Sequence, residues 1–246
     1  MKELKAIRIE GLTKRYRDIT AVDGLSLSVE QGELFSLLGV NGAGKTTTIK
    51  MLSCLASPSE GDAYLFGKSI CTESSAVKEF IAVSPQETAI AKGLSVKENL
   101  ELMCGIYGFS RDKRNAKIKE LTALLGLESV IDKKTGKLSG GIQRRTSIAM
   151  ALISEPKILF LDEPTLGLDV IARSDFWDII RSLKGRITIV LTTHYMEEAE
   201  ALSDRIAIMK DGKLLICDTA EEIKKAAKTD NFEQAFINIV KGGAKK

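Results

Sequence analysis

Ten residues, Gly39-Val-Asn-Gly-Ala-Gly-Lys-Thr-Thr-Thr48, decide how this 246-residue chain is interpreted. The first eight fit the pattern G-x-x-x-x-G-K-[ST], whose glycines let backbone N–H groups close around phosphate oxygens at a helix start. In that pattern Lys45 supplies a positive charge to the β- and γ-phosphates, and Thr46 supplies a hydroxyl to Mg²⁺. An apolar stretch at residues 34–38 precedes the loop and a helical stretch through Leu55 follows it, which is the context such a loop requires. The stretch therefore predicts a nucleotide site.

Two further apolar stretches lead directly into polar side chains. Residues 158–161 are followed by Asp162 and Glu163, and residues 187–191 are followed by two threonines and His194. The carboxyl ends of parallel strands meet at one edge of a sheet, where ligands of α/β proteins bind. At that edge Asp162 would hold Mg²⁺ through water, and Glu163 would accept a proton from the attacking water. His194, the single histidine, would hydrogen-bond the γ-phosphate or that water.

A second candidate site for an anion lies at Leu138-Ser-Gly-Gly-Ile-Gln143, before a helical stretch that continues through Ala151. Ser139 and two glycines at the start of a helix predict a nest of backbone N–H groups. One triphosphate can occupy only one phosphate-binding loop. A second nest in the same chain therefore indicates a second nucleotide, or the nucleotide of a partner chain.

Composition excludes several classes of function. The chain has 36 Lys+Arg against 33 Asp+Glu, and a dedicated nucleic-acid binder would more often be strongly basic, so we expect no nucleic-acid partner. One histidine and four widely spaced cysteines provide no ligand set for a protein-only zinc site. No apolar run approaches the roughly 20 residues of a membrane span, and residues 1–17 lack the apolar segment of a signal peptide. We therefore expect a soluble, cytoplasmic chain.

The order of elements predicts an α/β fold with a parallel sheet, because helical stretches alternate with buried strands. Residues 5–38 are expected to form strands, and residues 94–127 to form helices with a stop at Gly126. Residues 171–183 and 196–202 are expected to be helical as well. Residues 205–217 should form a β-hairpin around the turn Asp211-Gly212.

These motifs, in this order, resemble the nucleotide-binding domain of an ABC transporter over roughly residues 5–220. Residues 39–46 resemble the Walker A motif, and residues 158–163 the Walker B motif with its glutamate. Residues 138–143 resemble the signature motif. The remaining matches are Tyr16 with the A-loop aromatic that stacks on adenine, Gln86 with the Q-loop, Leu166-Gly-Leu-Asp169 with the D-loop, and His194 with the switch histidine.

The resemblance implies one ABC ATPase domain over residues 1–246. Its P-loop NTPase core would have a mainly parallel sheet and an N-terminal antiparallel β-subdomain, together spanning about residues 1–86 and 138–220. An inserted α-helical subdomain would span about 87–137, and a short C-terminal helix with a frayed tail about 221–246.

The resemblance also implies a head-to-tail homodimer, or a pair with a second ATPase subunit. Each ATP would lie between the Walker A motif of one subunit and the signature nest of the other. Gln86 would report to the helical insertion, whose surface would dock a polytopic membrane permease. The implied residues are Glu163, His194, Gln86 and Lys45 for catalysis; Tyr16, Gly39, Asn41, Gly42, Ala43, Gly44, Lys45, Thr46, Thr47, Ser139, Gly140 and Gly141 for ATP; Thr46, Gln86 and Asp162 for Mg²⁺; and Ser139, Gly141 and Asp169 for the dimer interface.

Two positions depart from the family pattern. The fifth signature residue is Ile142 where the family commonly has glutamine, and Gln143 cannot replace it because one residue rotates a helical side chain by about 100°. The phosphate contacts come from Ser139 and the glycine backbone, so we expect the motif to function. In the D-loop, Leu166 occupies a position where a small residue is more usual.

Residues 193–200 and 93–99 resemble the drug, lipid or ion export branch, whose membrane partner is typically a separate ABC-2-type subunit. Such a chain would be peripheral on the inner face of the cell membrane. The alternatives are an import-type ATPase subunit and a non-transport ATPase of DNA repair or translation. A repair ATPase would need a long coiled coil between Lys45 and Ser139, and a translation factor would need two cassettes. A GTPase would need the N-K-x-D and D-x-x-G motifs, which this sequence lacks.

Overall fold

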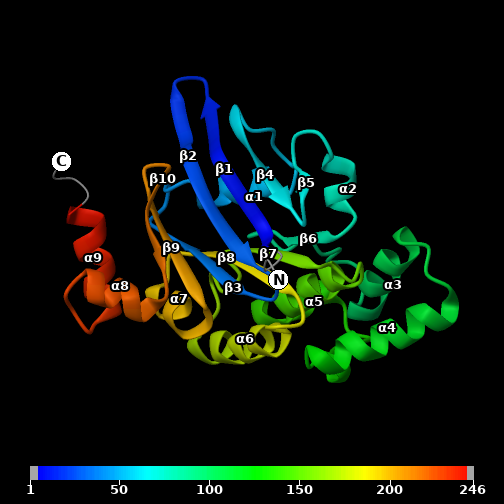
Figure 1. The fold of residues 1–246 in the computed structure, drawn as a ribbon. Coiled ribbons are helices and arrows are strands. Elements are labelled where there is room, and N and C mark those ends of the chain that lie inside the picture. The colour runs from blue at the N-terminus through cyan, green and yellow to red at the C-terminus, as the bar shows by residue number, and fades with distance from the viewer. Residues whose placement is uncertain (1–4, 243–246) are drawn as a thin grey trace.

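The strands of the computed structural model, which describes residues 5–242, form two sheets (Figure 1). Four antiparallel strands pair in the order β2-β1-β4-β5. Six strands pair in the order β10-β9-β3-β8-β7-β6, of which five are parallel and β10 joins antiparallel at one edge. The strands are β1 Lys5–Tyr16, β2 Ile19–Glu30, β3 Leu34–Leu38, β4 Glu60–Leu65, β5 Lys68–Ser69, β6 Ile81–Ser84, β7 Ile158–Asp162, β8 Thr188–Thr193, β9 Arg205–Lys210 and β10 Lys213–Asp218.

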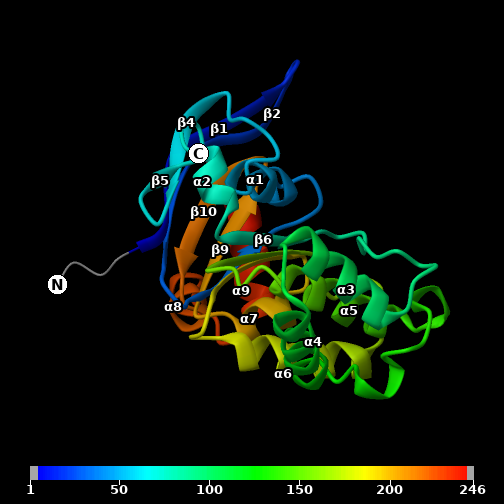
Figure 2. The same ribbon diagram turned by 90° about the vertical axis from the view of Figure 1, so that its right-hand side faces the viewer.

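Helices cover both faces of the six-stranded sheet (Figures 1 and 2). Helix α1 lies between the two sheets, α5 to α7 cover the opposite face, and α3 and α4 project to one side. Helices α8 and α9 lie at the other end of the molecule, beside β9 and β10. The helices are α1 Lys45–Leu52, α2 Ser74–Lys78, α3 Val96–Ile106, α4 Arg111–Leu124, α5 Gly140–Leu152, α6 Val170–Leu183, α7 Met196–Leu202, α8 Ala220–Ala226 and α9 Phe232–Gly242, with short 3-10 turns at Glu128–Val130 and Thr135–Lys137.

The central strands are apolar on both faces because both faces are covered. All five residues of β3 and of β7 are buried. In β7, Phe160 faces the cluster built around α1, whereas Leu159 and Leu161 face the cluster beneath α5 and α6. Strands that are buried on two sides show continuous apolar runs rather than alternation, which explains the sequence pattern. This packing fixes the carboxyl ends of β3, β7 and β8 relative to one another.

The fold class expected from the sequence is confirmed, including the parallel sheet and the antiparallel β-subdomain. The hairpin of β9 and β10 forms at the predicted turn, and Gly126 has the left-handed φ of +61° that a helix stop requires. Helices α3 and α4 lie inside the stretch predicted as a helical subdomain. The boundaries of that subdomain stay a prediction.

Several local expectations were wrong. Helix α1 ends at Leu52 rather than Leu55, and Cys54 then adopts a left-handed φ of +56° that turns the chain away. Strand β8 continues to Thr193 because its last residues pair with Asp162 and Leu38 of the neighbouring strands. Two helices, α8 and α9, replace the single C-terminal helix. The frayed tail predicted beyond them falls largely outside the described residues.

Candidate functional site

The loop after β3 has a shape that only glycine permits at three positions. Gly42 and Gly44 have φ values of +83° and +99°. A Cβ at Gly44 would lie 2.4 Å from the carbonyl oxygen of Ala21, and one at Gly39 would lie 2.5 Å from that of Met209. The loop is therefore pressed between β2 and the β9–β10 hairpin, and α1 begins immediately after it. This close packing holds the backbone N–H groups at the start of α1.

A cavity of about 830 Å³ opens over this loop. Strand β2 forms one wall of it, and the ends of β6, β7 and β8 contribute polar residues to the other. Its volume is within the usual range for small-molecule sites in proteins. The lining residues are Ile19, Thr20, Ala21, Asn41, Gly42, Ala43, Gly44, Lys45, Thr46, Thr47, Gln86, Glu163, Leu166, His194 and Asp211.

Glu163 occupies the rim of the cavity with its carboxylate held between two basic groups. Its Oε1 lies 3.5 Å from Nζ of Lys45, and its Oε2 lies 2.8 Å from Nδ1 of His194. The backbone N–H of Glu163 donates to the carbonyl and the hydroxyl of Thr192, at 3.1 and 3.0 Å. The residue has a left-handed φ of +45°, so its side chain leaves β7 in a direction that an extended strand would not allow.

Lys45 is the first residue of α1, directly after the phosphate-binding loop. Its Nζ donates to the carbonyl oxygens of Gly39 and Val40, at 2.7 and 3.3 Å. Burial lowers the pKa of Lys45, because desolvation penalises the ammonium group more than the nearby Glu163 carboxylate favours it. A buried ammonium at the start of a helix is well placed to meet phosphate oxygens.

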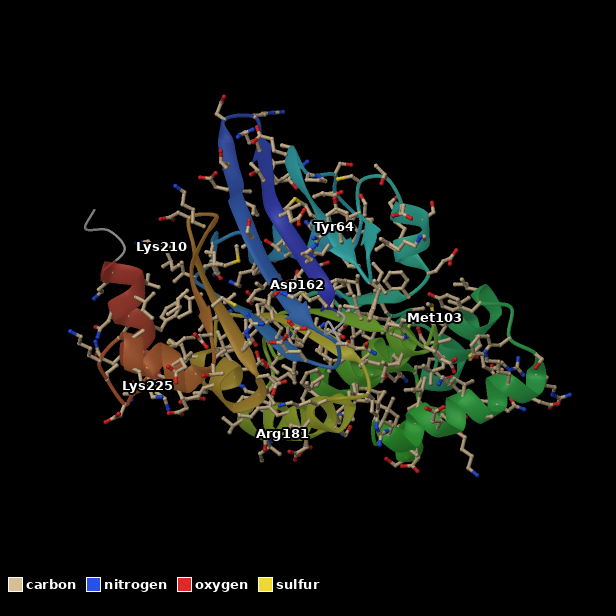
Figure 3. The ribbon with its side chains drawn as sticks, in the orientation of Figure 1. Tyr64, Met103, Asp162, Arg181, Lys210 and Lys225 are labelled. Carbon is tan, nitrogen blue, oxygen red and sulfur yellow. The ribbon has the colours of Figure 1, made fainter. Side chains whose placement is uncertain are left out.

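Asp162 lies behind this rim, near the centre of the molecule (Figure 3). Its Oδ1 accepts hydrogen bonds from the hydroxyls of Thr46, at 3.0 Å, and Thr192, at 2.5 Å. The carboxylate is therefore aimed at the helix start that carries Thr46. No function is assigned to Thr192 from the sequence, yet this residue contacts both acidic residues at the end of β7. Thr192 pairs with Asp162 across the neighbouring strands β7 and β8, so its role is apparent only from the sheet.

The structure brings most of the sequence-predicted residues to the cavity. Residues 41–47, Gln86, Glu163 and His194 line it, with Asp162 behind and Gly39 at the base of the loop. Tyr16 does not line it: its side chain is partly exposed at the end of β1, with the Lys14 ammonium 5.0 Å from its ring. The next strand, β2, supplies lining residues instead, and these were missed because they carry no polar pattern.

The signature nest is separate from this cavity. Ser139 is exposed and caps α5 by accepting a hydrogen bond from the N–H of Ile142. None of residues 139–141 lines the cavity over the loop, whereas Gly140 lines a second one of about 400 Å³ beside Gln86. Asp169 is also outside; its carboxylate caps α6 by accepting from the N–H of Ala172 at 2.9 Å. Within the described part of the chain, the two anion sites therefore do not meet.

Known proteins carry the same features. Residues 22–166 match the family model described as ABC transporter. The daunorubicin/doxorubicin resistance ATP-binding protein DrrA of Streptomyces peucetius is 40% identical over 223 residues, which cover 90% of this chain and 68% of that protein. The Nod factor export ATP-binding protein I of Burkholderia orbicola (strain AU 1054) is 43% identical, over 84% of this chain and 68% of that protein. The chain spans only 41% of the probable multidrug ABC transporter ATP-binding protein YbhF of Escherichia coli (strain K12), at 37% identity.

Solved structures agree with the sequence relatives. The ATP-binding cassette MJ1267, in its ADP conformation, superposes with a TM-score of 0.83 at 25% identity, covering 95% of this chain and 98% of that one. The cassette MJ0796, solved as a dimer in a post-hydrolysis state with ADP and Pi, superposes with a TM-score of 0.77 at 27% identity, covering 87% and 98%. With the phosphate-binding loop, the acidic strand end and the signature nest in their places, the chain belongs to the ABC transporter family, as a cassette that binds and hydrolyses ATP.

Proposed function

We propose that this chain powers export through a separate membrane subunit, hydrolysing ATP at sites shared between two copies. One observation carries the proposal. A carboxylate held between Lys45 and His194 faces the phosphate-binding loop, while the signature nest of the same chain lies outside that cavity. The first arrangement supplies a base for hydrolysis. The second supports a nest that acts on the nucleotide of a partner.

Glu163 is the proposed general base. Its Oε2 accepts a proton from the attacking water, and the hydrogen bond to Nδ1 of His194 keeps the carboxylate in place during the transfer. With Nδ1–H of His194 donating to this carboxylate, Nε2 of the ring is an acceptor, so it can accept a hydrogen bond from the attacking water. Lys45 moves from its loop carbonyls to the phosphates, where its positive charge stabilises the negative charge of the transition state.

The residues present also fit Mg²⁺. The Thr46 hydroxyl, the Asp162 carboxylate and the Gln86 amide are hard oxygen donors at one end of the cavity. Among the described residues no cluster of three His, Cys, Asp or Glu side chains could hold a metal by itself, so nucleotide phosphates would have to complete the site. Held by Thr46, Asp162 and Gln86, the ion would neutralise negative charge on the phosphates.

The proposed dimer is head-to-tail. The phosphate-binding loop of one copy faces residues 139–141 of the other, and Asp169 lies at the interface. Two-fold symmetry then creates two equivalent ATP sites, each with half of its contacts from each chain. The dimeric cassette bound to ADP and Pi among the structural relatives supports this arrangement.

Export is proposed because the relatives named above act in drug resistance and Nod factor export. In the described residues no helix is both long and apolar enough to cross a membrane. The proposed partner is a polytopic permease, as the resemblance to the export branch implies. It would hold this chain on the cytoplasmic face of the cell membrane and would dock near Gln86 and the helical segment of α3 and α4.

A Glu163→Gln variant tests the core of the proposal. The amide keeps the shape of the side chain but cannot accept the proton, so we expect the ATPase rate to fall by about 100-fold or more while MgATP traps a dimer. Gel filtration with MgATP, and again with EDTA, measures the dimer. Glu79→Gln, an exposed glutamate away from the cavity, is the matched control. A Glu163→Gln chain that stays monomeric with MgATP would overturn the proposed dimer.

A further inference from the structure

Arg144 is a buried cation that none of the steps above uses. It lies on α5, five residues after Ser139, and is 3% exposed. Its guanidinium donates four hydrogen bonds, all to backbone carbonyl oxygens. Nε and Nη2 donate to Pro164 and Glu163, at 2.8 and 2.9 Å, and Nη1 and Nη2 donate to Pro85 and Gln86, at 2.5 and 3.1 Å.

These contacts join two segments that are far apart in the sequence. One segment leaves β6 at the Q-loop and the other leaves β7 at Glu163. A planar guanidinium presents its donors in a fixed fork, so it sets the spacing of the two segments as well as holding them together. Since Arg144 belongs to the same helix as the signature nest, one rigid element connects Ser139 with the backbone of Gln86 and Glu163.

Packing alone does not account for an arginine at this position. Among the described residues Arg144 has no carboxylate within ion-pair distance, and an unpaired buried charge is expensive even when its hydrogen bonds are satisfied. A methionine of similar length would fill the space without that cost. What methionine would not do is hold four carbonyl groups.

The backbone N–H and the carbonyl oxygen of Glu163 are therefore both hydrogen-bonded. Thr192 accepts from its N–H, and Arg144 donates to its carbonyl oxygen. Glu163 has a left-handed backbone conformation that a non-glycine residue adopts only when its surroundings hold it there. Release of the carbonyl contact would let the peptide relax and turn the carboxylate away from the cavity.

We propose that Arg144 is a positioning residue, which transmits the position of the signature helix to the base Glu163 and to Gln86. When a partner's nucleotide contacts residues 139–141, movement of α5 reaches both segments through this guanidinium. Hydrolysis is thereby coupled to the assembled dimer. The inference rests on the proposed function, in which Glu163 is the base and the nest binds the partner's nucleotide.

The test compares Arg144→Lys and Arg144→Gln with Arg145→Gln. Arg145 is the next residue on the same helix, and its ion pair with Asp175 is partly exposed, so its variant should keep the wild-type rate. Lysine keeps the charge of residue 144 but cannot hold four carbonyl groups. We expect both Arg144 variants to lower kcat by about 10- to 100-fold, as misplacement of a catalytic group does, with KM and the Kd for ATP changed less than about twofold. Melting temperature verifies folding; if Arg144→Gln does not fold, Arg144→Lys carries the test.

A second measurement separates positioning from general damage. In a Glu163→Gln background the base is absent and only Gln86 is left to position, so adding Arg144→Lys should lower the residual kcat by a smaller factor than in the wild-type background, less than about threefold. An equal loss in both backgrounds would overturn the inference, as would an Arg144→Lys variant with wild-type kcat. If Glu163→Gln itself keeps the wild-type kcat, the proposed function is wrong, and this inference is wrong too because it depends on Glu163 as the base. If Glu163→Gln is inactive while Arg144→Lys is active, only the inference fails.

Discussion

At the scale of single residues, Glu163 shows how a reactive side chain is held. Lys45 and His194 contact its two carboxylate oxygens, and Thr192 contacts its backbone N–H. A base that is fixed at several points loses little freedom when the reaction begins, so little of the barrier is spent on orientation. The same contacts make Glu163 sensitive to changes in its neighbours.

Lys45→Ala should abolish nucleotide binding without unfolding the protein. The variant loses the charge that meets the phosphates, so we expect the Kd for ATP to rise by about 100-fold or more. The melting temperature should change by less than about 4 °C, because burial already opposes the charged form of Lys45. A fluorescent ATP analogue measures binding, and Lys50→Ala, an exposed lysine of the same helix, is the control. Wild-type affinity in Lys45→Ala would contradict the assignment of the loop.

A residue could be assigned a role from the sequence when its interaction partners lie close to it along the chain. The loop before Lys45 could be assigned from the sequence because its spacing along the chain is itself the signal, and the structure places this loop at the cavity. Thr192 and Arg144 were not assigned a role, since their partners lie on other strands and no spacing records them. Tyr16 was chosen by resemblance alone, and the structure places β2 rather than that ring against the loop.

At the scale of elements, strands and helices with a clear pattern were predicted well. The β9–β10 hairpin carries a two-residue turn, and α6 carries a regular apolar face. Strands β4, β5 and β6 were not predicted, because β5 and β6 have only two and four residues and β4 begins with Glu-Gly-Asp, which does not indicate a strand. Their positions are set by pairing with β1 and β7, which is a tertiary effect.

Helix α7 carries a buried carboxyl that should make stability depend on pH. Glu198 is fully buried and accepts a hydrogen bond from Nε1 of Trp177 at 3.2 Å; burial raises its pKa above the ordinary 4.5. The folded protein therefore keeps a proton that the unfolded chain releases above about pH 4.5, and stability falls as the pH rises from there through the folded pKa.

Glu198→Gln removes this dependence, because glutamine stays neutral and its oxygen can still accept from Trp177. We expect the variant to gain in melting temperature over the wild type between pH 5 and pH 8, by about 2–4 °C for each 1 kcal/mol of stability. Scanning calorimetry at several pH values measures the difference. Glu197→Gln, the exposed neighbour, should show no such trend. A constant difference across the pH range would contradict a raised pKa for Glu198.

At the scale of the whole molecule, the two anion sites lie in different places, and this predicts a specific pattern of complementation. A Lys45→Ala chain has a defective phosphate-binding loop and an intact signature nest. A Ser139→Arg chain has an intact loop and a defective nest. Each should be inactive alone. In a mixed dimer, one of the two shared sites is intact, so an equal mixture should recover about a quarter of the wild-type ATPase activity.

The ATPase rate of the mixture, compared with each variant alone, is the measurement. The control mixes a chain that carries both substitutions with the Lys45→Ala chain, because no dimer of these two chains contains an intact site. Recovery in that control, or none in the test mixture, would contradict sites shared between two chains.

The pairing of β3 with β8 also affects how the chain folds during its synthesis on the ribosome. Leu34 pairs with Ile189, so β3 has to wait for about 150 further residues before its neighbour exists. At ribosomal speeds of about 5–20 residues per second, that wait lasts roughly 10–30 s. During this time a strand with four large apolar residues has no neighbouring strands, and the loop that follows it has no acidic residues beside it. A nascent chain therefore needs protection from aggregation at β3, and gains its affinity for ATP only after β7 and β8 have been made.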